Sequence, residues 1–179
     1  MMPPKMKSNK KNKRLLLLII VTLCTSIGLY AYLPAPRFRA PDVTLKTITN
    51  NTVQLKQLQG KVVLVTFWAT DCPSCLKEIP HLKSLYQNYH QQGLEIFAIA
   101  SYYDPPNHVV DASKTYQIPY GIVLDLRMKL ASAFGDVRLT PTTFLISPAG
   151  EIVYQITGSF DFEAMQARIE SYLSPQGTH

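Results

Sequence analysis

The sequence has few cysteines and few charged residues for its length. Only three cysteines occur among 179 residues, which excludes the multi-bridge disulfide framework of small secreted domains. Charged residues make up 17% of the chain and apolar residues 46%, a balance that excludes wholesale disorder. Because the chain also lacks internal repeats, its length fits one compact domain with a short additional segment.

The first 14 residues contain no acidic side chain, and they carry the excess positive charge of the whole chain. Six of the 18 lysines and arginines fall within residues 1–14, and the formal net charge is +6. From residue 15 onward the remaining 12 basic residues face 12 acidic ones. The excess charge is therefore a terminal tail and not a binding face, so no nucleic-acid partner is expected.

Residues 15–33 form an apolar run that contains no charged side chain. As a helix rising about 1.5 Å per residue, this run would span about 28 Å, close to the thickness of a bilayer's hydrocarbon core. Basic residues flank only its N-terminal end, while Tyr30 and Tyr32 lie near the other end. This pattern predicts a single-pass anchor in the inner (cell) membrane, with a cytoplasmic N-terminus and a periplasmic or other extracytoplasmic domain.

Two other roles for this apolar run fit the sequence less well. A cleaved signal peptide usually has an apolar core of about 7–15 residues and a small-residue cleavage site, whereas this run is longer and is followed by Pro34-Ala-Pro36. A lipid-modified Cys24 would need a small residue before it, but bulky Leu23 stands there. We therefore favour an uncleaved anchor in which Cys24 is an apolar filler.

Proline-rich residues 34–40 are predicted to link this anchor to a single domain over residues 41–174, which a tail at 175–179 follows. Apolar runs and turn residues predict strands, the first two of them in a hairpin, over 43–48, 53–55, 61–68, 94–100, 120–124, 142–146 and 152–156. Helical spacing predicts helices over 73–93, 108–116, 126–134 and 162–173. This order predicts an α/β fold in which helices cover both faces of the sheet.

The remaining two cysteines are spaced C-x-x-C, in Cys72-Pro-Ser-Cys75, directly after a buried strand and at the start of a helix. A helix N-terminus offers free N–H groups and partial positive charge, which stabilise a thiolate. Pro73 suits a first helical turn, where its missing N–H costs nothing. The spacing therefore predicts thiol–disulfide exchange, in which Cys72 attacks a substrate disulfide and Cys75 resolves the mixed disulfide.

Other uses of a C-x-x-C pair lack the partners that they need. Structural zinc requires two further ligands, but no second pair exists, and His81 and His90 lie along the same or the adjacent helix. A thiol peroxidase carries a threonine three residues before its reactive cysteine, where Ala69 stands. We therefore expect neither a metal nor another cofactor.

The segment from Gly60 to Pro80, GKVVLVTFWATDCPSCLKEIP, resembles the active-site stretch of the TlpA/ResA-like branch of the thioredoxin superfamily. The similarity continues in Pro41-Asp-Val-Thr-Leu, in Val123-Leu-Asp125 and in Leu139-Thr-Pro-Thr-Thr-Phe-Leu-Ile146. It covers residues 40–173. It implies a thioredoxin-like fold with a central mixed sheet, an N-terminal anchor, and an extracytoplasmic thiol–disulfide oxidoreductase activity.

The same resemblance implies a substrate-binding edge beside the cysteine pair. Pro141 would be the cis-proline of the family, and a cis bond there would let the backbone of Thr140 pair with a substrate peptide as a short added strand. Trp68 is expected to pack beneath the active site at this edge. Tyr102, Tyr103 and Asp104 follow a strand end, where they either line the substrate groove or form a plain surface loop.

Two positions depart from the family pattern and would modulate the pair together with the intervening Pro73 and Ser74. Asp71 replaces the usual Trp before the first cysteine. Its carboxylate would disfavour the Cys72 thiolate and make the pair a better reductant, unless solvent screens the charge. Thr66 replaces the buried Asp of cytoplasmic thioredoxins, so water or Glu78 would have to move protons for Cys75. We expect Glu78 to be a solvated acid on the helix face.

These features together predict an extracytoplasmic disulfide reductase. By resemblance, its substrates would be protein disulfides, for example those of apocytochrome c or of copper-site cysteines, and a transmembrane thiol carrier would supply electrons. Two alternatives remain open. A dithiol oxidase would use the same residues in the opposite direction, and a non-catalytic thioredoxin-like copper metallochaperone would need a further His or Met ligand near the cysteines.

Overall fold

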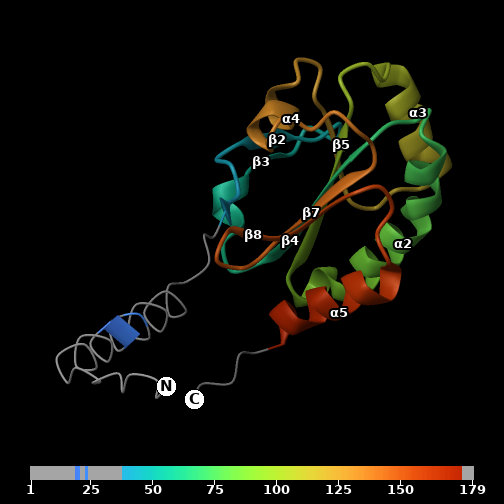
Figure 1. The fold of residues 1–179 in the computed structure, drawn as a ribbon. Coiled ribbons are helices and arrows are strands. Elements are labelled where there is room, and N and C mark those ends of the chain that lie inside the picture. Colours follow the sequence, from blue (N-terminus) through green and yellow to red (C-terminus); the bar gives the residue numbers. More distant parts are fainter. Residues whose placement is uncertain (1–18, 21–22, 24–37, 175–179) are drawn as a thin grey trace, which may run out of the picture. The chain divides into compact units, whose positions relative to one another are not determined.

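The computed structural model describes residues 19–20, 23 and 38–174 (Figure 1). Contacts divide the chain into two units, residues 1–37 and residues 38–179, and the second unit contains the whole α/β fold. Among the described residues, no helix is both long and apolar enough to cross a membrane. The predicted anchor at 15–33 lies almost wholly outside the described part of the chain, as do the basic tail at 1–14 and the C-terminal tail at 175–179.

The domain is built on a mixed six-stranded sheet. Its strands lie in the order β1 (Phe38–Arg39), β8 (Glu151–Thr157), β7 (Thr142–Ile146), β4 (Val62–Trp68), β5 (Leu94–Ala100) and β6 (Gly121–Leu124). The β4, β5 and β6 strands are parallel, while β7 is antiparallel to both β4 and β8. A separate hairpin pairs β2 (Thr44–Lys46) with β3 (Thr52–Gln54).

Helices cover both faces of this sheet (Figure 1). They are α2 (Pro73–Tyr89), α3 (Pro106–Thr115), α4 (Lys129–Ala133) and α5 (Phe162–Leu173), with short 3₁₀ turns at η1 (Leu55–Leu58) and η2 (His90–Gln92). The α2, α3 and α5 helices pack on one face, and α4 packs with the β2–β3 hairpin on the other. The predicted thioredoxin-like α/β arrangement is therefore confirmed for this domain.

The central strand β4 is buried over its whole length because it has a core on each face. Alternating side chains of a strand point to opposite faces. Leu64 accordingly lies in the core under α2 and α5, and Val65 in the core under α4. All seven residues of β4 are buried, which accounts for its continuous apolar sequence.

The register of β4 with its two neighbours places three chain segments at one edge of the sheet. Trp68, the last residue of β4, lies opposite Ala100, the last residue of the parallel strand β5. Phe67 lies opposite Thr142, the first residue of the antiparallel strand β7. The start of α2, the loop after β5 and the segment before β7 therefore meet at this edge.

Two local predictions differ from the structure. The helix expected over 126–134 is confined to Lys129–Ala133, because Met128 adopts a left-handed conformation with φ 54° and Asp125 accepts a 2.8 Å hydrogen bond from Ala131 N–H. The predicted linker at 34–40 includes Phe38 and Arg39. These two residues form β1, which pairs with the start of β8.

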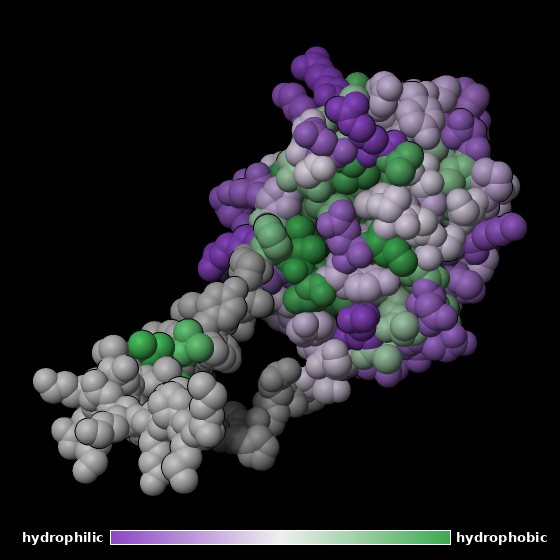
Figure 2. Space-filling model, viewed as in Figure 1, coloured by the Kyte–Doolittle hydropathy of each residue, from purple (hydrophilic) through white to green (hydrophobic). Residues whose placement is uncertain are grey.

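The face of the domain seen in Figure 2 is largely hydrophilic. Figure 2 shows hydrophilic residues around the rim of the face in view, with apolar residues in small patches between them. The large aromatic and aliphatic side chains of β4, β5 and β7 lie instead in the two cores. This division between surface and interior is the expected result of burying apolar area on folding.

Phe144 is the largest of the fully buried side chains, and its removal should destabilise the domain strongly. It is 1% exposed, and its ring centroid lies 5.0 Å from that of Phe134 and 6.1 Å from that of Phe67. We expect Phe144→Ala to lower the free energy of unfolding by about 3–5 kcal/mol, through lost burial and a residual cavity. Urea unfolding of the oxidised protein measures this change.

The control for this prediction is Leu126→Ala, since Leu126 is 57% exposed. We expect this substitution to change the free energy of unfolding by no more than about 0.5 kcal/mol. A loss of under about 1 kcal/mol for Phe144→Ala would mean that the core under α4 does not contribute as described.

Candidate active site

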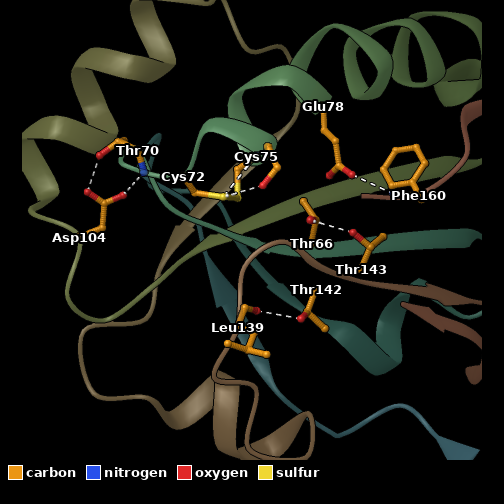
Figure 3. Close-up of a disulfide and its surroundings, with 11 residues drawn as sticks. Thr66, Thr70, Cys72, Cys75, Glu78, Asp104, Leu139, Thr142, Thr143 and Phe160 are labelled. Atoms are coloured by element: carbon orange, nitrogen blue, oxygen red, sulfur yellow. Dashed lines mark hydrogen bonds between the residues drawn. A yellow bond between two sulfur atoms is a disulfide. The ribbon is translucent and has the colours of Figure 1, made fainter. Parts of the chain in front are cut away.

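Cys72 and Cys75 form a disulfide at the N-terminus of α2, with their Cα atoms 5.3 Å apart. Figure 3 shows this disulfide at the start of the helix, next to the loops that follow β4 and β5. Cys72 is 9% exposed and Cys75 is 3% exposed. Cys72 is thus the more exposed residue of the pair, although both lie close to the protein interior.

Cys72 is the N-cap residue of α2, and its sulfur accepts a hydrogen bond. Its backbone is extended, with φ −101° and ψ 103°, and the Cys75 N–H donates to Cys72 Sγ at 3.2 Å. Ser74 Oγ lies 3.3 Å from the same sulfur, and Pro73 occupies the first turn. In the reduced protein, these donors and the helix dipole would stabilise a thiolate on Cys72.

The loop after β5 contains a buried carboxylate that contacts the segment just before Cys72. Asp104 is 4% exposed, and it accepts hydrogen bonds from Thr70 N–H and from Thr70 Oγ1, each at 2.6 Å (Figure 3). Its neighbours Tyr102 and Tyr103 are 54% and 50% exposed. The loop is therefore not a plain surface loop, because Asp104 is hydrogen-bonded to Thr70 in the segment before Cys72.

The Thr140–Pro141 peptide bond is cis, as the family resemblance implied. Pro141 is buried and Thr140 is partly exposed, while Leu139 is 66% exposed. Thr142 Oγ1 donates to the Leu139 carbonyl at 2.8 Å. Figure 3 shows Leu139 and Thr142, the residues on either side of this dipeptide, where the chain enters β7. Because Thr142 pairs with Phe67, Thr140 and Pro141 lie at the edge of the sheet where β4 ends, just before the cysteine segment.

Glu78 lies in the protein interior, and the expectation that it is a solvated acid on the helix face is wrong. It is 4% exposed, because the segment before α5 covers it, and its Oε1 accepts a 3.0 Å hydrogen bond from Phe160 N–H. Burial raises the pKa of Glu78, while the hydrogen bonds from Phe160 and Ser159 partly oppose this shift. Glu78 is therefore a carboxyl group whose proton affinity is increased near the cysteines.

Polar groups meet in a small cavity of about 10 Å³ beneath the disulfide, which Cys75, Glu78, Thr66, Trp68 and Tyr120 line among others. Thr66 Oγ1 accepts a 3.0 Å hydrogen bond from Thr143 Oγ1. Within residues 38–174, Trp68 Nε1 is a buried donor without a hydrogen-bond partner. Burial raises the pKa of Tyr120, so its phenol remains protonated. Trp68 accordingly packs beneath the site.

The two histidines considered as zinc ligands are engaged elsewhere. The His81 ring packs 4.9 Å from the Phe162 ring, and the His90 ring stacks 4.3 Å from the Tyr86 ring. In the described part of the chain, no group of three or more His, Cys, Asp and Glu side chains is arranged to hold a metal ion. These histidines therefore do not join the cysteine pair.

A thioredoxin-like sheet with a C-x-x-C disulfide at the start of its active-site helix defines a thiol–disulfide oxidoreductase. Comparison with known proteins places the chain more narrowly. The family model described as Redoxin matches residues 36–173, and the chain belongs to that family.

Its relatives include proteins named thiol-disulfide oxidoreductase ResA. The ResA of Halalkalibacterium halodurans is 31% identical over 163 residues, which cover 88% of this chain and 92% of the relative. The ResA of Bacillus subtilis is 35% identical over 120 residues, covering 67% and 66% of the two chains. The protein is therefore a ResA-like enzyme that exchanges thiols and disulfides.

Solved structures support the same fold. A thioredoxin-family thiol:disulfide interchange protein from Chlorobium tepidum superposes with a TM-score of 0.72 at 25% identity, covering 79% of this chain and all of the other. StoA from Bacillus subtilis superposes with a TM-score of 0.62 at 24% identity, over 72% of this chain and 97% of the other. The second likeness shows the fold alone.

Replacing Glu78 by Gln should stabilise the protein at neutral pH. The variant keeps an oxygen that accepts from Phe160 N–H but has no charge. Because the folded-state pKa of Glu78 is raised, ionisation of the wild-type carboxyl destabilises the fold as the pH rises from 4.5 through the raised pKa. We expect Glu78→Gln to unfold at higher urea concentration than wild type at neutral pH, with no difference below pH 4.5.

Asp111→Asn is the matched control, because Asp111 is exposed on α3. Its effect on the urea midpoint should be small at every pH. A Glu78→Gln variant that is less stable than wild type at neutral pH would contradict the assigned direction of the pKa shift.

Proposed function

We propose that this thiol–disulfide oxidoreductase works as a disulfide reductase on proteins outside the cytoplasmic membrane. The observation that carries the direction is the charge beside the nucleophile. Asp71 is exposed and directly precedes Cys72, at the position where the family usually has Trp. A carboxylate there disfavours the thiolate of the reduced enzyme, and a dithiol whose reduced form is less stable gives up its electrons more readily.

The geometry of the site supports an ordinary exchange sequence. The Cys72 thiolate attacks one sulfur of a substrate disulfide, which breaks that S–S bond and releases one substrate thiolate. Cys75 then loses its proton and attacks Cys72 Sγ, which releases the second substrate sulfur as a thiol. The substrate disulfide gains two electrons and two protons, and the enzyme is left with the Cys72–Cys75 disulfide that the structure contains.

Glu78 is the proposed proton acceptor for Cys75. The two residues line the same cavity, and Thr66, which replaces the buried acid of cytoplasmic thioredoxins, cannot accept a proton from a thiol. A carboxyl group with a raised pKa is better matched to a thiol than an ordinary solvated one. Glu78, on α2, would thus take the role that the buried Asp has in cytoplasmic thioredoxins, where this chain has Thr66 on β4.

Substrates are proposed to bind along the segment before β7. Exposed Leu139 and half-exposed Tyr102 and Tyr103 line a small pocket together with Thr140. The backbone of Thr140 would pair with an extended substrate peptide, and the apolar side chains would contact residues that flank the substrate cysteine. This surface suits exposed protein disulfides better than small thiols.

The cellular setting of the proposal follows from the N-terminal sequence. Residues 15–33 would anchor the protein in the inner membrane, with the basic tail in the cytoplasm and the domain periplasmic or otherwise extracytoplasmic. Apocytochrome c and copper-site cysteines are the proposed substrate classes. A transmembrane thiol carrier is the proposed electron donor, since reduction outside the cytoplasm needs electrons from within.

A dithiol oxidase is the second candidate, because two contacts favour it. The Cys75 N–H and Ser74 Oγ both lie within hydrogen-bond distance of Cys72 Sγ and would stabilise its thiolate, as in strongly oxidising pairs. The described residues offer no comparable observation for a copper metallochaperone. The reduction potential separates the two candidates.

We expect the reduction potential of the full-length protein to lie near the thioredoxin value of about −270 mV, and Asp71→Asn to raise it by roughly 10–30 mV. Removing the charge stabilises the Cys72 thiolate and hence the reduced form. Equilibration with glutathione buffers measures both values, and Asp111→Asn on α3 is the matched control. A wild-type value near −120 mV would identify an oxidase instead.

A trapping experiment tests the assigned roles of the two cysteines and names the substrates. Cys75→Ser should accumulate mixed disulfides between Cys72 and its substrates, because the resolving thiol is absent. Mass spectrometry of the trapped adducts identifies the partner proteins, with Cys72→Ser as the control. If only Cys72→Ser accumulates adducts, Cys75 is the attacking residue.

A further inference from the structure

A buried carboxylate joins the carboxyl ends of two parallel strands at the active site. Asp104 follows β5, and its Oδ2 and Oδ1 accept from the N–H and the Oγ1 of Thr70, which follows β4, each at 2.6 Å. Both carboxylate oxygens of Asp104 therefore act as acceptors for the same residue. Asp104 is 4% exposed, and these two hydrogen bonds offset the cost of burying its carboxyl group.

The residue that Asp104 holds lies in the turn that leads to Cys72. The Cys72 N–H donates to the Ala69 carbonyl at 3.3 Å, so Thr70 and Asp71 are the two central residues of this turn. Through Thr70, the carboxylate fixes the turn from which Cys72 enters α2 as its N-cap residue.

The backbone of Asp104 is connected to the end of β4 through Ser101. The Asp104 N–H donates to the Ser101 carbonyl at 3.0 Å, and the Ser101 N–H donates to the Trp68 carbonyl at 2.9 Å. The loop after β5 is thereby bonded to the last residue of β4, only two residues before Thr70. Together with the bonds between Asp104 and Thr70, which Figure 3 shows, these backbone bonds connect the two strand ends.

We propose that Asp104 is a positioning residue for the nucleophile: it fixes the Ala69–Cys72 turn so that the sulfur of reduced Cys72 stays within reach of the Cys75 N–H. In the oxidised enzyme the disulfide holds Cys72 Sγ beside Cys75, in addition to the turn and the hydrogen bond from the Cys75 N–H. Once that bond opens, the turn determines where the sulfur lies. This inference rests on the proposed role of Cys72 as the attacking cysteine.

The positioning effect and the charge of Asp104 act in opposite directions on the Cys72 thiolate. Correct positioning brings the sulfur to the helix N-terminus and favours the thiolate. The negative charge disfavours it. Asp104→Asn separates the two effects, because the amide oxygen still accepts from Thr70 N–H and the amide nitrogen donates to Thr70 Oγ1. Asp104→Ala removes the charge and both hydrogen bonds.

The test uses the full-length chain with Cys24→Ser and Cys75→Ser, so that Cys72 is the only thiol. The rate of Cys72 alkylation by iodoacetamide is measured across pH for wild-type Asp104, Asp104→Asn and Asp104→Ala. We expect Asp104→Asn to react fastest at pH 7, with its profile shifted to lower pH, and Asp104→Ala to react roughly tenfold more slowly than Asp104→Asn. Thermal unfolding of each variant is recorded alongside.

Equal pH profiles for Asp104→Asn and Asp104→Ala would overturn the proposal, even if the Ala variant is less stable, because a purely structural role changes only the unfolding temperature. A second comparison does not depend on the stability of the Asp104→Ala variant. Thr70→Val removes the hydroxyl that bonds Asp104 and should slow alkylation, whereas Thr70→Ser keeps a hydroxyl and should react at the wild-type rate. Failure of Cys75→Ser to trap substrates would contradict the proposed function while leaving this order of rates unchanged.

Discussion

The complete burial of β4 is the constraint on which the active site depends. A strand with a core on each face cannot slide or tilt without exposing apolar side chains or creating cavities. Its end at Trp68 is therefore a fixed point, and the pairing of β4 with β5 and β7 brings two other segments to that point. The segments that contain the cysteines, Asp104 and Thr140–Pro141 meet at this edge because the register of the sheet places them there.

Opposing electrostatic effects converge on Cys72 from this fixed frame. The N–H of Cys75 and the dipole of α2 favour a thiolate, whereas Asp71 and Asp104 place negative charge on the preceding turn and the adjoining loop. Beneath the pair, burial increases the proton affinity of Glu78. The reduction potential of the enzyme thus reflects the balance of several modest electrostatic effects. A single substitution that removes one of them should therefore change the potential measurably.

The sequence predicted most of the sheet and the identity of the cysteine pair, because both have local signatures. Buried strands are read from apolar runs, and the active-site helix from the position of Pro73 and the spacing of its apolar residues. The short β1 strand was not predictable in this way, since Phe38 and Arg39 are defined only by pairing with β8. The early end of the helix expected at 126–134 depends on the backbone of Met128.

The environments of the two buried acids, Glu78 and Asp104, could not be predicted from the sequence, because they also depend on distant segments. The position of Glu78 in its helix does not show whether the side chain faces solvent or the interior. It is buried because the segment before α5, which contains Phe160, packs over it. Asp104 is recognisable as a residue at a strand end, but its bond to Thr70 spans 34 positions. Contacts of this kind are created by the tertiary fold, and no local pattern encodes them.

The disulfide at the active site closes a loop between residues only three positions apart. The conformational entropy that a cross-link removes from an unfolded chain grows with the length of the loop that it closes. So short a ring restrains the unfolded chain little, and the two cores on either side of β4 contribute far more to the stability of the domain. Opening the only cross-link among the described residues should therefore cost the domain little stability.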